Sequence, residues 1–262
     1  MSKPRKILIL IGNNVSEGMR SALVNCDGFL KIPTSIANFG SREAFAELFP
    51  KDTANYRVNV TTLKGADVVV IQSTGGEVSD SCMKLFEMIH TLKRNGARHV
   101  TVAMPFTAFD RQDRKFEGRF VSEGAQLMPA LLKAAGADNI IVITPHSQAA
   151  MRYYREEFGT NYTALSATDL FVDDIRQRFD LNNVVIGAPD GANKPEDEGQ
   201  RRAITLAEKI FNDSTVDRRL FKISKIHTAV STTEILEFEG DVKGKDCVCI
   251  DDMVDGGSTM IK

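Results

Sequence analysis

Residues 247–260, CVCIDDMVDGGSTM, combine three carboxylates with a turn of small residues. A short apolar run ends in Asp251 and Asp252, and Asp255 precedes the Gly-Gly-Ser-Thr run 256–259. Backbone amides in such a turn can bind an anion at the start of a helix. Carboxylates beside a phosphate would repel it unless they accept hydrogen bonds from sugar hydroxyls or hold a hydrated Mg²⁺. This order favours a sugar-phosphate or nucleotide site over the alternative, an N-capped helix behind an acidic surface loop.

A second charged segment, FDRQDRKFEGR at 109–119, directly follows the apolar run 99–105. Its arginines suit bidentate contacts with phosphate and stacking on a base. Gln112 could hydrogen-bond a base edge or a phosphate. A run of mixed charge is usually a solvated loop with internal ion pairs, but its position after a predicted strand favours a ligand site.

Three further side chains are candidates because of where they stand. His146 follows the apolar run 139–145 and could bind a metal, contact a phosphate or transfer a proton. The alternative is a helix-capping or packing histidine. Asp190 follows the run 183–189 and is either a metal or sugar contact or a turn aspartate. Lys222 lies in a basic segment that either closes over phosphates or is an ordinary surface segment.

These candidates need a scaffold, and the apolar pattern predicts one. Six runs are nearly continuous in Val, Ile, Leu or Ala, which is typical of strands buried on both faces of a parallel sheet. Helical patterns alternate with them, so we predict an α/β fold with helices on both faces of a mostly parallel sheet. Such sheets bind ligands beyond the carboxyl ends of their strands. The predicted strands are 6–11, 67–73, 99–105, 139–145, 183–189 and 246–252, and the predicted helices are 80–95, 122–135 and 198–211, with a short one at 41–49.

The composition limits the classes of function. The chain has 262 residues, of which 42% are hydrophobic, and a formal net charge of -2. Near-neutral charge gives no general attraction to nucleic acid or to anionic membranes. No apolar run approaches the roughly 20 residues that span a bilayer, and the run 7–11 is too short for a signal peptide. We therefore expect neither a nucleic acid nor a membrane partner.

The cysteines and the domain division give two further expectations. The four cysteines have no disulfide-framework or zinc-site spacing, so a reducing cytoplasm fits best. Cys247 and Cys249 alternate along a predicted strand and are expected to be buried on one face. Residues 155–182 lack a strong strand, and we place the domain boundary near 155–165, dividing 1–158 from 159–262.

Together these motifs resemble the ribose-phosphate diphosphokinase family, the phosphoribosyl pyrophosphate synthetases. The loop DDMVDGGST alone would indicate only the broader phosphoribosyltransferase class, but RQDRK upstream is specific to the synthetases. The resemblance covers roughly residues 64–262. Its motifs, in the family's order and at about its spacing, are IQST at 71–74, FDRQDRK at 109–115, the strand ending at His146, APD at 188–190 and DDMVDGGST at 251–259.

The resemblance implies a fold, a reaction and a set of site residues. The fold is two phosphoribosyltransferase-like α/β domains, the first carrying the ATP loop and the second the ribose-phosphate loop, assembled as a homo-oligomer, a dimer or a hexamer. The reaction moves the diphosphoryl group of ATP to the C1 hydroxyl of ribose 5-phosphate, with Mg²⁺ as cofactor. The implied roles are catalytic for Lys222; ATP-binding for Arg111, Gln112, Asp113 and Arg114; metal-binding for His146 and Asp190; and ribose-5-phosphate-binding for Asp251, Asp252, Asp255, Gly256, Gly257, Ser258 and Thr259.

The chain also departs from the family pattern. Ser224 stands where the family has an arginine two positions after the catalytic lysine. The acidic–aromatic hairpin that reaches a neighbour's ATP is not recognisable in residues 28–60. The family continues past the phosphate loop with a helix and further strands, so we expect the second domain to be incomplete at its C-terminal end. Two alternative functions remain: a catalytically silent regulatory subunit of a synthetase complex, and a phosphoribosyltransferase that consumes the activated sugar.

Overall fold

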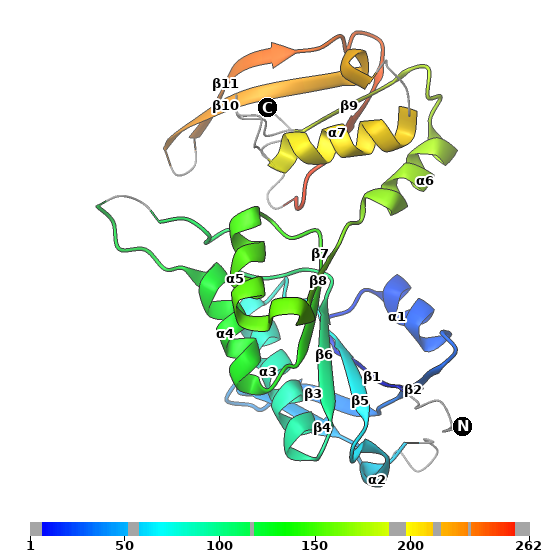
Figure 1. Cartoon of the computed structure of the whole chain (residues 1–262), viewed down its shortest axis with the longest axis vertical. Helices are drawn as coiled ribbons and strands as arrows, with labels where there is room; N and C mark the ends of the chain where they lie inside the picture. The colour runs from blue at the N-terminus through cyan, green and yellow to red at the C-terminus, as the bar shows by residue number, and fades with distance from the viewer. Residues whose placement is uncertain are drawn as a thin grey trace. The chain divides into compact units, whose positions relative to one another are not determined.

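The apolar runs form the strands of two main sheets (Figure 1). The computed structural model describes residues 7–51, 58–115, 118–188, 198–211, 216–229 and 232–254. It divides into two units, Met1–Leu165 and Ser166–Lys262, and each is described by itself.

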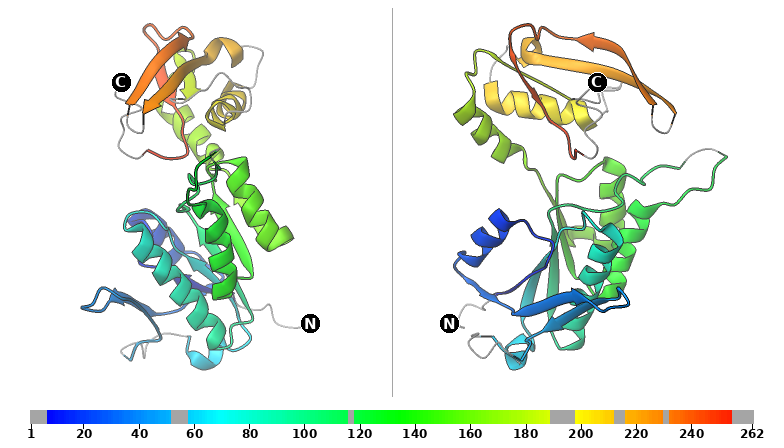
Figure 2. Two further views of the ribbon diagram at one scale, coloured as in Figure 1. Left: turned by 90° about the vertical axis from the view of Figure 1, so that its left-hand side faces the viewer. Right: turned by 180° about the vertical axis from the view of Figure 1, so that it is seen from behind.

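Unit 1 is built on a six-stranded parallel sheet. Its strand order is β2-β1-β5-β6-β7-β8. Helices α3, α4 and α5 lie side by side on one face, and α1 lies on the other (Figures 1 and 2). The chain therefore reverses its direction of travel across the sheet between β1 and β5. The elements are β1 (Ile7–Ile11), α1 (Glu17–Val24), β2 (Phe29–Lys31), α2 (Val60–Leu63), β5 (Asp67–Ile71), α3 (Val78–Arg94), β6 (His99–Met104), α4 (Gly124–Ala135), β7 (Asn139–Ile143), α5 (Gln148–Phe158), η1 (Gly159–Asn161) and β8 (Tyr162–Leu165).

The core of unit 1 explains why its strands read as continuous apolar runs. Val68 and Val70 of β5 and Val100 and Val102 of β6 are almost fully buried, and they pack in one cluster with the apolar face of α3. Most of the alternate residues, on the opposite face of these strands, are half-buried, so neither strand has a fully solvated side and polar alternation is weak. This confirms the predicted parallel sheet flanked by helices.

An antiparallel hairpin in unit 1 corrects two expectations. Strands β3 (Thr34–Asn38) and β4 (Ala44–Leu48) pair with each other, and the predicted helix at 41–49 is therefore wrong. Side chains along β4 alternate between half-buried and exposed, which is the period of a strand. Residues 28–60 thus do contain a hairpin, and its rings Phe39 and Phe45 lie 5.0 Å apart.

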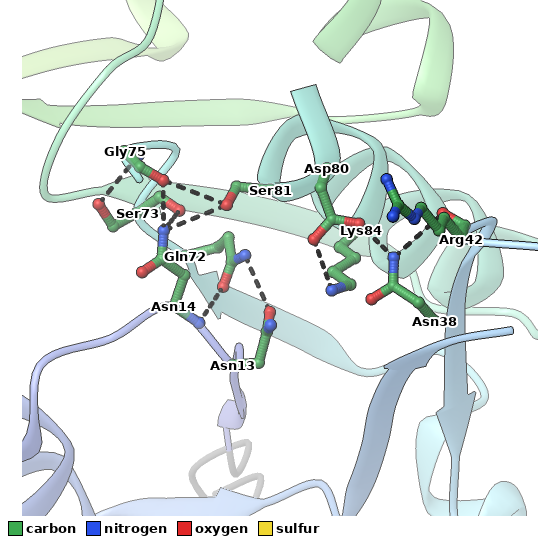
Figure 3. Close-up of polar contacts among 10 residues, drawn as sticks. All are labelled: Asn13, Asn14, Asn38, Arg42, Gln72, Ser73, Gly75, Asp80, Ser81 and Lys84. Carbon is green, nitrogen blue, oxygen red and sulfur yellow. Dashed lines mark hydrogen bonds and ion pairs between the residues drawn. The ribbon is translucent and has the colours of Figure 1, made fainter. Parts of the chain in front are cut away.

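The hairpin is attached to α3 by charged and polar side chains (Figure 3). The Asn38 amide donates to Asp80 at 2.5 Å, and Lys84 pairs with the same carboxylate at 2.6 Å. These two donors, Lys84 first, hold the pKa of Asp80 below its usual range. The contact fixes the turn end of the hairpin on the first turns of the helix.

Unit 2 has a four-stranded sheet in the order β11-β10-β9-β12. Strands β10 and β12 run parallel to β9, and only β11 is antiparallel to its neighbour. Its core joins the buried side chains of β9 to the apolar faces of α6 and α7. The elements are α6 (Thr168–Arg178), β9 (Val184–Ala188), α7 (Glu198–Phe211), η2 (Val216–Arg219), β10 (Leu220–Ala229), β11 (Thr232–Glu239) and β12 (Asp246–Cys249).

The division between the units lies after Leu165, seven residues beyond the boundary at 158 that we expected. The difference arises from β8, a strand of four residues, 162–165, that the apolar pattern did not reveal. It pairs with β7 and so completes the sheet of unit 1.

The cysteines differ in exposure, and none of the four forms a disulfide. Cys82 on α3 is buried, and burial raises the pKa of its thiol to about 11. Cys247 and Cys249 are exposed, so the expectation that they are buried is wrong. They lie on β12, an edge strand of the described sheet. Most of its side chains are exposed, whereas all five residues of β9 are buried. Among the described helices, none is long and apolar enough to cross a membrane.

Replacing Tyr154 with phenylalanine is expected to stabilise the chain by about 1 kcal/mol. The ring is fully buried and stacks on Tyr162, but among the described residues its hydroxyl has no hydrogen-bond partner. Burial raises its pKa well above 10. Urea denaturation measures the change, and Tyr162→Phe is a second test that should also stabilise the chain, since the Tyr162 hydroxyl is likewise buried without a hydrogen-bond partner among the described residues. A loss of stability in Tyr154→Phe would contradict the expectation.

Candidate functional site

The arginine-bearing loop 109–115 leaves β6 at the carboxyl edge of the unit 1 sheet. Arg111 and Arg114 are exposed on it, so their guanidinium groups are accessible to a ligand. Gln112 is held in place, because its side-chain oxygen accepts a hydrogen bond from Ser122 at 3.1 Å. Its backbone NH also donates to the carbonyl of Phe109 at 2.8 Å. The loop thus combines a hydrogen-bonded backbone with two exposed arginine side chains.

Asp113 differs from the other predicted ATP residues because its side chain is only 3% exposed. Its carboxylate accepts a hydrogen bond from the Ser147 hydroxyl at 2.5 Å, and Arg114 Nε lies 3.5 Å from its other oxygen. Asp113 therefore faces the protein, toward the loop that follows β7.

His146 lies in that loop, half-buried, between β7 and α5. The structure thus brings two of the predicted segments together, the RQDRK loop and the His146 loop, through the contact between Asp113 and Ser147. The other predicted metal residue, Asp190, lies outside the described residues. Within the described part of the chain no three His, Cys, Asp or Glu side chains gather as a metal site.

In unit 2 the sheet places Lys222 beside the end of β9. The register pairs Lys222 of β10 with Ala188, the last residue of β9, from which the chain continues toward Asp190. Lys222 is 27% exposed, and its Nζ lies 3.8 Å from Glu239 Oε1 on β11. The side chain of Ser224 lies outside the described part, as do residues 255–259 of the predicted phosphate loop.

The acidic pair stands at the end of β12, where the Ile250 amide donates to the Gly187 carbonyl at 2.9 Å. Arg202 of α7 reaches Asp252 at 3.2 Å and Asp251 at 3.8 Å. Asp252 is only 5% exposed and Asp251 is 21% exposed. The arginine offsets the charge of the more buried carboxylate and leaves Asp251 the more accessible of the two.

Comparisons with known proteins point to one family. The family model for the N-terminal domain of ribose phosphate pyrophosphokinase matches residues 38–136. Ribose-phosphate pyrophosphokinase from Corynebacterium efficiens is 30% identical over 233 residues, which is 86% of this chain and 67% of that protein. The chain belongs to the ribose-phosphate pyrophosphokinase family. The homologue from Agrobacterium fabrum is 28% identical over 235 residues, 88% of this chain and 67% of its own length.

A solved member of the family has the same fold. The crystal structure of phosphoribosylpyrophosphate synthetase from Mycobacterium smegmatis matches with a TM-score of 0.73 and 25% identity, over 98% of this chain and 74% of that one. The chain spans 58% of the length of the Hyphomonas neptunium pyrophosphokinase, with 31% identity. The chain thus spans between 58% and 67% of the length of these three pyrophosphokinases.

In this pyrophosphokinase family member the loops that follow β1 and β5 are joined by polar side chains (Figure 3). Open α/β sheets bind ligands where the strand order reverses, which in unit 1 is between β1 and β5. The Asn14 amide donates to the carbonyls of Ser73 and Gly75, both at 2.9 Å, and to Ser81 Oγ at 3.2 Å. Gln72, fully buried, accepts from the Asn14 backbone at 3.1 Å. The predicted ATP residues lie instead beyond β6.

Two polar residues of this pyrophosphokinase family member contact the site but were not predicted from the sequence. Ser147 was inconspicuous, although a serine just before an apolar-periodic segment is a helix-start signal. Arg202 sat on a predicted helix, and only the fold brings it to the acidic pair. Both act on residues far away in the sequence, so no local pattern reveals them.

Replacing Asp251 with asparagine is expected to stabilise the chain at pH 7 and to lose that effect in acid. Burial, with Asp252 as the second cause, raises the pKa of Asp251 from 3.8 to about 6, while Arg202 opposes the shift. A carboxyl whose pKa is raised by folding favours the native state when protonated; that contribution is full below about pH 4 and is lost as the pH rises through about 6. Asparagine removes the cost of the buried charge.

Urea denaturation between about pH 5 and pH 7.5 measures this difference. Asp241→Asn, an exposed carboxylate of the same unit, is the matched control and should show a small, flat difference. A stability difference for Asp251→Asn that stays constant over the range would contradict the raised pKa.

Proposed function

We propose that the chain transfers the diphosphoryl group of ATP to the C1 hydroxyl of ribose 5-phosphate, giving 5-phosphoribosyl 1-diphosphate and AMP. The observation that carries the proposal is the direct contact between the RQDRK loop and the His146 loop at one sheet edge, in a member of this family. Phosphoryl-type transfer depends mainly on positioning and on charge neutralisation. Both loops offer groups of that kind.

The proposed roles follow from position and charge. Arg111, Gln112 and Arg114 bind ATP. Lys222 stabilises negative charge on the transferred and leaving oxygens, and no side chain needs to act as a covalent nucleophile. Asp251 and Asp252, with residues 255–259, bind the sugar and its 5-phosphate, Asp251 being the more exposed carboxylate.

We propose Mg²⁺ as the cofactor. His146 and Asp190 would hold it, and it would neutralise charge on the phosphates of ATP. The carboxylate suits a magnesium ion that keeps several water molecules and contacts substrate oxygens, and the imidazole would hydrogen-bond one of those waters or contact the ion through nitrogen. The half-buried His146 is compatible with this arrangement.

The wider assignments belong to the same proposal. Unit 1 carries the ATP loop and unit 2 the ribose-phosphate loop. The chain acts in the cytoplasm as a homo-oligomer, a dimer or a hexamer. The hairpin of β3 and β4, with its exposed Phe39, supports assembly, since a family hairpin of this kind reaches a neighbour's ATP.

The alternative of a catalytically silent regulatory subunit is favoured by Ser224, which lacks the charge of the family arginine. The alternative of a phosphoribosyltransferase that consumes the activated sugar does not account for the RQDRK loop. Titration calorimetry distinguishes them. Binding of both ATP and ribose 5-phosphate supports the synthetase, and absence of nucleotide binding supports the regulatory subunit.

The direct test is AMP formation from ATP that depends on both ribose 5-phosphate and Mg²⁺. The full-length natural protein is used, and folding is checked by circular dichroism. Turnover that requires both additions supports the proposal. A folded preparation with no turnover, or turnover without ribose 5-phosphate, would overturn it.

A further inference from the structure

The Asp113 carboxylate is almost buried, yet it belongs to the loop that carries the exposed Arg111 and Arg114. A carboxylate at 3% exposure is costly unless it is hydrogen-bonded. Its short contact is the 2.5 Å hydrogen bond from the Ser147 hydroxyl, a residue 34 positions later. A buried acceptor supplied by one loop and a donor supplied by another tie the two loops together.

We propose that Ser147 is a positioning residue, whose hydroxyl holds the RQDRK loop, through Asp113, against the start of α5 beside His146. This proposal rests on the function proposed above. It moves Asp113 from the residues that touch ATP to those that place the ATP-binding side chains.

The Ser147 hydroxyl also accepts a hydrogen bond from the backbone NH of Ala150 at 3.1 Å, as the N-cap of α5. One oxygen therefore accepts from the helix and donates to Asp113. The helix spans Gln148–Phe158 and packs on α4, so the capped turn is a firm support. The RQDRK loop is thereby fixed to the first turn of α5.

Backbone strain lies at the start of both loops. Phe109 has φ 65° and Thr144 has φ 47°, and both values belong to the left-handed region. For the β-branched Thr144 this conformation is an outlier, and such strain persists only where the surroundings enforce it. The Thr144 amide donates to the Leu165 carbonyl at 2.7 Å, which holds this turn from the other side.

Loss of the contact between Ser147 and Asp113 should affect only one of the two substrates, ATP. If the contact sets the distance between the arginines and His146, its loss should weaken ATP binding and leave ribose 5-phosphate binding in place. A purely structural role would lower stability or would affect both substrates alike.

The first measurement is amide hydrogen exchange on the ligand-free protein. Ser147→Gly removes the hydroxyl and costs the helix cap only a few tenths of a kcal/mol, while Ser147→Thr keeps the hydroxyl. Exchange in 109–115 is expected to be about tenfold faster in Ser147→Gly and in Asp113→Ala, and unchanged in Ser147→Thr. Ser16→Gly is the matched control, because Ser16 caps α1 in the same way through the Met19 amide. Unchanged exchange of residues 109–115 in Ser147→Gly would overturn the proposal that the Ser147 hydroxyl holds this loop.

The second measurement is kinetic. Ser147→Gly should raise KM for ATP about tenfold and change KM for ribose 5-phosphate less than about twofold, with Ser147→Thr close to the natural protein. The double variant with Asp113→Ala should be no worse than either single variant, because one contact is lost only once. Equal losses for both substrates, or multiplying effects in the double variant, would overturn the positioning role.

The two proposals fail separately. If the natural protein has no turnover, the proposed reaction is wrong. The positioning role is then tested by comparing the dissociation constants for ATP of the natural protein and the variants. A natural protein that does not bind ATP overturns the positioning role as well. If the natural protein turns over and Ser147→Gly matches it in exchange and KM, only the positioning role is wrong.

Discussion

Replacing Lys222 with alanine is expected to lower kcat by about 10²- to 10³-fold while KM for either substrate changes little. The register of β10 against β9 sets this lysine beside Ala188, at the edge from which the chain runs toward Asp190. In the proposed reaction, a cation at that edge would meet the charge that develops as the diphosphoryl group leaves AMP. Its removal therefore affects the transition state more than the bound substrates.

Steady-state kinetics with each substrate varied in turn measures the effect. Lys243→Ala is the matched control, because Lys243 is an exposed lysine of the same unit in the turn before β12. Glu239→Gln adds a second variant, since it removes the carboxylate 3.8 Å from Lys222 and keeps the lysine. A rise in KM as large as the fall in kcat/KM would show that Lys222 contributes ground-state binding only.

Replacing Gly187 with alanine is expected to destabilise the chain by about 3 kcal/mol. Gly187 sits in the central strand β9, between Phe221 of β10 and Cys249 of β12. A Cβ there would lie 2.5 Å from the Phe221 backbone oxygen and 2.6 Å from its ring. Two backbones cannot separate at this point without breaking the register that places Lys222.

Chemical denaturation measures the loss, and Gly18→Ala is the control. Gly18 lies in α1, where an added Cβ meets no atom within 4 Å, so alanine there should stabilise by about 0.5–1 kcal/mol. Gly187→Ala should also lower activity more than stability alone requires, because Lys222 is the next residue after Phe221. A substitution at Gly187 with unchanged stability would contradict the close approach.

The sequence predicted the buried strands and long helices well, for a physical reason. A strand covered on both faces must be apolar throughout, and α7 begins and ends at the predicted 198 and 211 because its apolar face is continuous. The β3–β4 hairpin was missed because β4, AFAEL, contains Ala, Glu and Leu, which favour helix, and tertiary packing on α3 overrides that preference.

The candidate site was predictable only in its individual segments. The position of each segment after a strand follows from the apolar pattern. What the segments do to one another does not, because the burial of Asp113 and the ion pair of Asp252 depend on partners 34 and 50 residues away. Such contacts are set by packing between elements, which no local spacing records.

The single buried thiol makes unfolding of unit 1 chemically visible. Cys82 lies within the core of that unit, and its raised pKa leaves almost no thiolate at neutral pH, whereas Cys26, Cys247 and Cys249 are open to reagent. Alkylation should thus proceed as a fast phase at three sites and a slow one at Cys82. The rate of the slow phase reports how often unit 1 opens, without any change to the sequence.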